Sequence, residues 1–115
     1  MENRQLAMKM AKILSDKKAA GITVIDIGGK SGFADYFVIA TAGSLRQLDA
    51  LTDELEDKLA QDEIFVDHVE GKGESGWVLL DYGDIIANLF TEEQRERYQI
   101  EKIWSDCPCI DIEEE

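Results

Sequence analysis

The chain has 115 residues, 44% of them hydrophobic, so we expect one domain, large enough for a single core without disulfides or metal. Its 25 acidic residues outnumber its 12 Lys and Arg residues, and the net charge of −13 argues against direct DNA binding and against more than a little RNA contact. No run of about 18 apolar residues is present, and the N-terminus leads into an amphipathic segment instead of a signal peptide, so we expect a cytoplasmic protein without membrane contact.

The first half of the chain predicts a helix, two strands and a second helix. Residues 3–18 carry apolar side chains at helical spacing, with basic side chains on the other faces. Residues 22–27 and 36–41 are rich in β-branched side chains and nearly continuous in hydrophobicity, which is typical of strands covered on both faces. Ser44 is predicted to cap a helix that begins at Leu45 and carries a strongly acidic outer face. The apolar stripe of this helix comprises Leu48, Leu51, Leu55 and Leu59.

The second half predicts three strands and a short helix. Residues 64–70, 77–82 and 85–90 have strand-like patterns and are separated by polar, Gly-containing turns. Thr91 and Gln94 match a capping box, which predicts a helix through about residue 98.

This order of elements predicts an α/β domain. We expect a mixed sheet of about five strands flanked by helices over residues 1–104. Residues 105–115 are predicted to be an acidic, flexible tail. The tail contains Cys107 and Cys109 on either side of a proline, and these are expected to be reduced thiols of a cytosolic protein.

The segment Gly29-Lys30-Ser31 resembles the end of a phosphate-binding P-loop, but its context is wrong. The motif requires a glycine where Val24 stands, inside a predicted strand. A second strand follows, and not the helix whose N-terminus would bind the phosphates. The sequence therefore predicts a turn here.

A nucleotidyltransferase remains an alternative. Ser44 stands at a predicted helix start, as such enzymes require, and Asp81 and Asp84 flank a predicted turn that is needed to bring them to one metal ion. His68 is the single histidine and is expected to be structural. Cys107, Cys109 and His68 fall short of the four ligands of a structural zinc site. We therefore predict no catalytic residues, no bound metal and no cofactor.

Five blocks stand out along the chain, and they are Lys30-Ser-Gly-Phe-Ala-Asp35-Tyr36-Phe-Val-Ile, Ser44-Leu-Arg46-Gln47, Val69-Glu70-Gly71, Trp77-Val-Leu-Leu-Asp81-Tyr82-Gly83-Asp84 and Tyr98-Gln-Ile-Glu101-Lys-Ile-Trp104. In this order, over about residues 5–104, they resemble the blocks of the ribosomal silencing factor family, which is related to the plant Iojap protein. The resemblance implies a nucleotidyltransferase-like fold without transferase activity. It also implies docking on the large ribosomal subunit through large-subunit ribosomal protein fourteen, which sterically blocks joining of the small subunit and represses translation when nutrients are short.

The charge of the chain fits a basic ribosomal protein as partner. Trp77, Leu79 and Asp81 are predicted to share one strand face, with Tyr82 at the following turn, and this composition is typical of an interface core and its rim. The remaining predicted contact residues are Asp84, Asp35, Tyr36 and Glu70.

Three points stay open at the level of sequence. Trp77 and Tyr36 have the alternative of lying in the core. Many family members have histidine where this chain has Asn88, so a role for that histidine does not transfer. The basic first helix and the acidic second helix also suggest self-association of the free protein as a homodimer.

Overall fold

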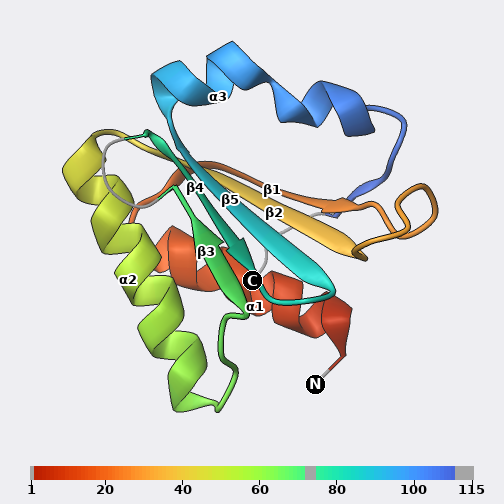
Figure 1. The fold of residues 1–115 in the computed structure, drawn as a ribbon, viewed down its shortest axis with the longest axis horizontal. Coiled ribbons are helices and arrows are strands. Elements are labelled where there is room, and N and C mark those ends of the chain that lie inside the picture. The colour runs from red at the N-terminus through yellow and green to blue at the C-terminus, as the bar shows by residue number, and fades with distance from the viewer. Residues whose placement is uncertain (1, 72–74, 111–115) are drawn as a thin grey trace.

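The computed structural model describes residues 2–71 and 75–110, which form a mixed sheet with helices on both faces (Figure 1). The helices are α1 (Asn3–Asp16), α2 (Leu45–Gln61) and α3 (Glu92–Tyr98), followed by the 3-10 helix η1 (Ile100–Trp104). The strands are β1 (Ala20–Asp26), β2 (Tyr36–Ala42), β3 (His68–Glu70), β4 (Trp77–Asp81), β5 (Ile85–Thr91) and β6 (Cys109–Ile110).

The strand order in the sheet is β3-β4-β5-β2-β1-β6. The central pair β2 and β5 is parallel, and the other neighbours are antiparallel. The predicted α/β fold class is confirmed, with six strands where about five were expected. The additional strand is β6, which pairs with β1 from within the segment assigned to the tail, while residues 111–115 lie outside the described residues.

The predicted strand over residues 64–70 is too long. Ile64 and Val66 pack against the core and Phe65 points outward, so the alternation expected of a strand is real. The ladder needs a partner, however, and β4 ends at Asp81, opposite His68. β3 therefore begins at His68, and its three residues pair with Leu79–Asp81 of β4.

The two predicted helix caps are present. The Ser44 hydroxyl accepts a hydrogen bond from the backbone N–H of Gln47, and the Thr91 hydroxyl accepts one from the backbone N–H of Gln94. Each cap satisfies one of the backbone donors that a helix start leaves without an intrahelical partner. The polypeptide therefore turns from β2 into α2, and from β5 into α3, where the sequence indicates.

The helices divide between the two faces of the sheet. α1 and α2 cover one face, and their apolar stripes form the larger core cluster with β2, β4 and β5 (Figure 1). α3 and η1 lie over the other face, where a second cluster centres on the fully buried Ile39 and Phe90. No helix within the described ranges is long and apolar enough to cross a membrane.

Candidate docking surface

The side chains of β4 alternate between the two faces of the sheet, as the pleat requires. Val78 and Leu80 are fully buried beneath α1 and α2. Trp77, Leu79 and Asp81 point to the other face and are each half-buried. The structure thus places these three predicted contact residues together, on the part of the sheet that α3 and η1 leave open.

Trp77 belongs to both the core and the surface. Its ring stacks on Phe90, with centroids 5.0 Å apart, and lies 4.7 Å from the ring of Tyr98. Its indole N–H donates to Asn88 Oδ1 at 3.0 Å, so the one polar group of the indole is satisfied inside the protein. The contacts with Phe90, Tyr98 and Asn88 together hold the indole in one orientation, while part of its surface stays open to solvent.

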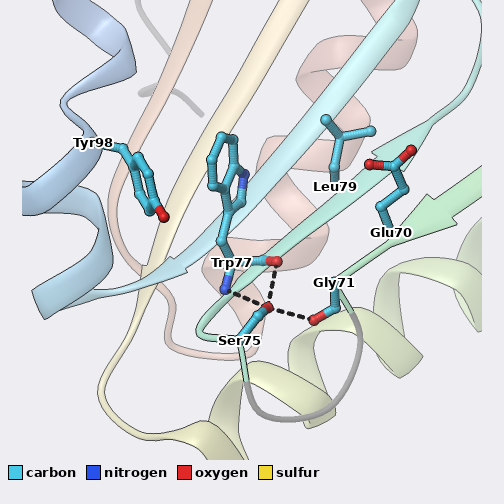
Figure 2. Close-up of a pocket in the computed structure, with 6 residues that line it drawn as sticks. All are labelled: Glu70, Gly71, Ser75, Trp77, Leu79 and Tyr98. Atoms are coloured by element: carbon cyan, nitrogen blue, oxygen red, sulfur yellow. Dashed lines mark hydrogen bonds between the residues drawn. The ribbon is translucent and has the colours of Figure 1, made fainter.

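A hollow of about 260 Å³ lies beside Trp77 on this open face (Figure 2). We call it the β4 hollow, and it is lined by Glu70, Gly71, Ser75, Trp77, Leu79 and Tyr98. Leu79 forms the apolar floor next to the indole, and the exposed carboxylate of Glu70 stands at the side away from Tyr98 (Figure 2). The hollow therefore combines aromatic and aliphatic walls with one negative charge, and this composition suits a protein partner.

One end of the β4 hollow is fixed by a tight turn of the backbone. Ser75 Oγ lies 2.7 Å from the carbonyl oxygen of Gly71 and 2.9 Å from that of Trp77, and it accepts from the Trp77 N–H (Figure 2). Gly71 has φ +85°, and a Cβ there would lie 2.0 Å from the Trp77 carbonyl oxygen. Only glycine allows this approach between the end of β3 and the start of β4.

Tyr82 lies on the opposite side of the sheet from Trp77. It packs against the larger core cluster, beneath α1 and α2, whereas Trp77 packs against the second cluster on the face of α3 and η1. Burial, together with the negative charge of Glu56 on α2, raises the pKa of the Tyr82 phenol to about 12. The phenol oxygen is buried and has no hydrogen-bond partner among the described residues. The two aromatic residues do not form one exposed surface.

The Tyr82→Phe variant is expected to be as stable as the wild type near neutral pH, or slightly more stable, because it removes a buried hydroxyl that makes no hydrogen bond within residues 2–71 and 75–110. The pKa of Tyr82 is higher in the folded than in the unfolded chain, so the stability contributed by the neutral phenol is complete below about pH 10 and is lost as the pH rises through about 12. Urea unfolding of both proteins between about pH 8 and pH 11 tests this, because only the wild type should lose stability through this group. Parallel pH profiles would show that the phenol titrates alike in both states.

Asp35 and Asp84 meet at the other end of the sheet. The side-chain amide of Asn3 donates to the carboxylates of both, at 2.9 and 3.2 Å, and the backbone N–H groups of Asp35 and Tyr36 donate to the Asp84 carbonyl oxygen. Tyr36 itself packs against the larger core cluster, beneath α1 and α2. These three predicted contact residues lie together at the start of β2 and β5, whereas Trp77 pairs with Phe90 near the end of β5. The predicted contact residues are therefore spread along the strands from Trp77 to Asp84, and Asp81, which pairs with Ile86, lies near the Asp84 end.

The residues of the nucleotidyltransferase alternative are far apart. Ser44 follows the end of β2, where Ala42 pairs with Thr91, while Asp84 precedes the start of β5. Six residue steps along a strand separate these ends, or about 20 Å at roughly 3.3 Å per residue. The Asp81 carboxylate accepts from the Gly83 N–H. In the described parts of the chain, no three His, Cys, Asp or Glu side chains are grouped as metal ligands.

The Gly-Lys-Ser segment is a turn, as predicted. Lys30 Nζ donates to the Ile103 carbonyl oxygen and to Asp106, at 3.0 and 2.9 Å, and lies over the Trp104 ring. This ion pair lowers the pKa of the exposed Asp106 carboxyl. Lys30 thus holds η1 and the following segment onto the turn.

The sequence prediction missed three residues of the hollow, which are Gly71, Ser75 and Tyr98. For Tyr98, the only signal of a role in the sequence is its position in a matching block at the end of a predicted helix. Its contact with Trp77 joins positions 21 residues apart in sequence and depends on how α3 folds back over the sheet. Helical spacing alone does not give this contact.

Comparison with known proteins identifies relatives of the whole chain. A family profile described as "Ribosomal silencing factor during starvation" matches residues 1–115. The chain is 34% identical over 113 residues to ribosomal silencing factor RsfS of Bacillus subtilis, covering 98% of this chain and 96% of that one. It is 30% identical over 100 residues to the Mus musculus protein "Mitochondrial assembly of ribosomal large subunit protein 1", covering 84% of this chain and 43% of that one.

A crystal structure of a protein from Chromobacterium violaceum has the same fold. It matches with a TM-score of 0.85 and 30% identity, over 91% of this chain and 88% of that one. These matches confirm the family resemblance drawn from the five sequence blocks.

Proposed function

Because this chain belongs to the ribosomal silencing factor family, we propose that it is a cytoplasmic, ribosome-binding repressor of translation that acts by steric exclusion. It docks on the large ribosomal subunit through large-subunit ribosomal protein fourteen, and its bulk blocks joining of the small subunit. The name of the mouse relative, which refers to assembly of the large subunit, supports this choice of subunit.

The observation that carries the proposal is the open face of β4. Trp77 and Leu79 are only half-buried there, and the carboxylates Glu70 and Asp81 stand on the same face. A fixed tryptophan with aliphatic surface around it and carboxylates at the edge is the arrangement found at centres of protein interfaces. We place the partner on this face.

The charge of the chain supports a basic protein as the partner in preference to RNA. With a net charge of −13, the chain is repelled by exposed RNA phosphates and attracted to ribosomal proteins, which are basic where they neutralise RNA. Steering of this kind accelerates association and weakens as salt is added.

Sedimentation with separated ribosomal subunits tests the proposal. The protein should travel with the large subunit and stay at the top of the gradient with the small one. Purified large-subunit protein fourteen should compete for it. Equal recovery with both subunits, or none with either, would contradict the proposal.

A further inference from the structure

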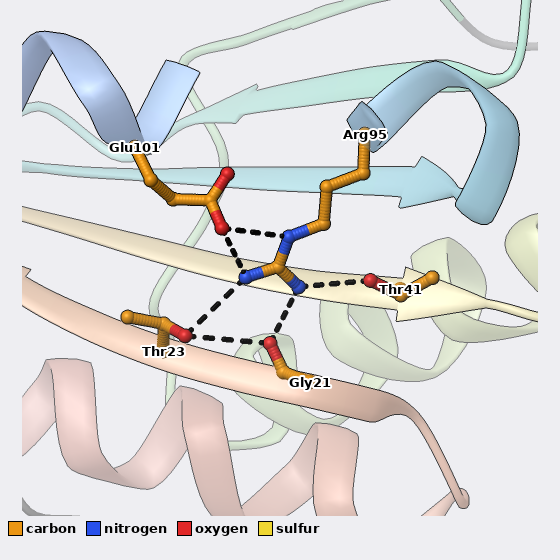
Figure 3. A network of polar contacts seen from close by, with 5 residues as sticks. All are labelled: Gly21, Thr23, Thr41, Arg95 and Glu101. Atoms are coloured by element: carbon orange, nitrogen blue, oxygen red, sulfur yellow. Dashed lines mark hydrogen bonds and ion pairs between the residues drawn. The ribbon is translucent and has the colours of Figure 1, made fainter. Parts of the chain in front are cut away.

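Arg95 joins α3 to three other elements of the fold (Figure 3). Its guanidinium donates to the carbonyl oxygen of Gly21 in β1 and, at 2.8 Å, to the hydroxyl of Thr41 in β2. On its other side, Nε and Nη2 donate to one carboxylate oxygen of Glu101 in η1, at 3.0 and 2.7 Å. A further contact of 3.3 Å joins Nη2 to the Thr23 hydroxyl. We call this set of contacts the Arg95 fork.

The position of α3 depends on the Arg95 fork. The helix has seven residues and buries none of them, so it has neither the length nor the apolar stripe that holds a helix in place. Its start is fixed by the Thr91 cap, and its end is a left-handed residue, Gln99. The Arg95 side chain is 16% exposed, and its bonds join the middle of α3 to β1, β2 and η1. Gly21 leaves room for the guanidinium, since a Cβ there would lie 2.9 Å from Arg95 Nη1.

Tyr98 stands three residues after Arg95 and depends on the same helix. Its ring lies 4.7 Å from that of Trp77 and forms one wall of the β4 hollow, yet 47% of the residue is exposed (Figure 2). The exposed Arg97 guanidinium lies over the Tyr98 ring, 5.6 Å from its centroid, while the exposed carboxylates Glu92, Glu93 and Glu96 lie on other faces of α3. The helix thus presents an aromatic ring next to Trp77, with an arginine over it and carboxylates around the rest of the helix.

We propose that the docking surface extends from β4 onto α3, with Tyr98 as a second aromatic contact to the basic partner and Arg95 as the residue that positions it. This inference rests on the proposed function and adds to it. Arg95 does not touch the partner, since its donors are directed into the fold. It acts by keeping Tyr98 in the bound position before docking, so that this side chain does not have to be ordered when the partner arrives.

The test is a double-mutant cycle read as affinity for purified large subunits. Tyr98→Ala should weaken binding about tenfold, as truncation of an interface tyrosine does, and Tyr98→Phe should bind like the wild type. Arg95→Met should weaken binding about fivefold in the wild-type background and by less than about twofold in the Tyr98→Ala background, because a residue that acts through Tyr98 has nothing left to position. Lys12→Met removes a positive charge from the opposite face of the sheet and is the matched control.

A milder variant keeps the test usable if Arg95→Met does not fold. Thr41→Val removes one acceptor of the Arg95 fork at nearly constant volume, and its effect should also depend on the presence of Tyr98. If wild type binds and Tyr98→Ala binds equally well, the extended surface is wrong while the proposed function stands. If the Arg95 and Tyr98 effects multiply independently, Arg95 is not a positioning residue. Failure of the wild type to bind large subunits would overturn the proposed function itself.

Discussion

Replacing Trp77 by alanine is expected to weaken docking on the large subunit about a hundredfold or more, because a central, fully oriented tryptophan is the residue type with the largest effects in interface truncation. The protein should still fold, since Trp77 is half-buried and its loss should lower the free energy of unfolding by only about 2 kcal/mol. Quantitative sedimentation with large subunits measures the affinity, and urea unfolding measures the stability.

Two further variants separate contact from packing. Trp77→Phe keeps a ring over Phe90 but removes the N–H bonded to Asn88, so we expect an intermediate loss of affinity. Phe65→Ala removes an aromatic side chain that is 67% exposed outside the β4 hollow, and docking should be unchanged. If Trp77→Ala unfolds the protein, this tryptophan is essentially core, and the interface assignment loses its central residue.

Phe90→Ala is expected to show the second large effect, on stability and docking together. The side chain is 0% exposed and supports the Trp77 ring from below, so truncation should cost about 3–5 kcal/mol of unfolding free energy and release the indole from its position. At a temperature where the variant is still folded, affinity for the large subunit should fall although no surface atom has been removed.

Leu55→Ala provides the comparison for Phe90→Ala. Leu55 is also 0% exposed but lies in the larger core cluster, on the other face of the sheet from Trp77. Its truncation should lower the free energy of unfolding by about 2–5 kcal/mol without changing the position of the Trp77 ring. Docking of the folded fraction should then be normal. An equal loss of affinity in both variants would mean that docking follows overall stability and not the seating of Trp77.

The sequence predicted the elements that local physical rules determine. The caps at Ser44 and Thr91 lie where hydroxyl residues precede helical patterns. The shared direction of Trp77, Leu79 and Asp81 follows from the period of two in a strand, which does not depend on the rest of the fold. The P-loop interpretation could be rejected on the sequence too, because Val24 stands where the motif requires glycine and a strand follows in place of a helix.

The sequence could not predict what depends on contacts between distant segments. β6 exists because Ile110 finds Val24 at an open sheet edge, and β3 is short because β4 ends at Asp81. The direction of Tyr82 depends on the turn after β4, where the strand period no longer applies. In the sequence, Arg95 does not differ from other basic residues near a helix end. Its hydrogen bond to Gly21, 74 positions away, depends on the fold and could not be predicted.

The most direct test of the account measures subunit joining itself. Separated subunits are mixed with increasing wild-type protein, and light scattering records the joined ribosomes while sedimentation records how many large subunits carry the protein. The account predicts that joining falls in proportion to the occupied large subunits and that Trp77→Ala at the same concentration leaves joining intact. Undiminished joining by large subunits that are saturated with the wild-type protein would contradict it.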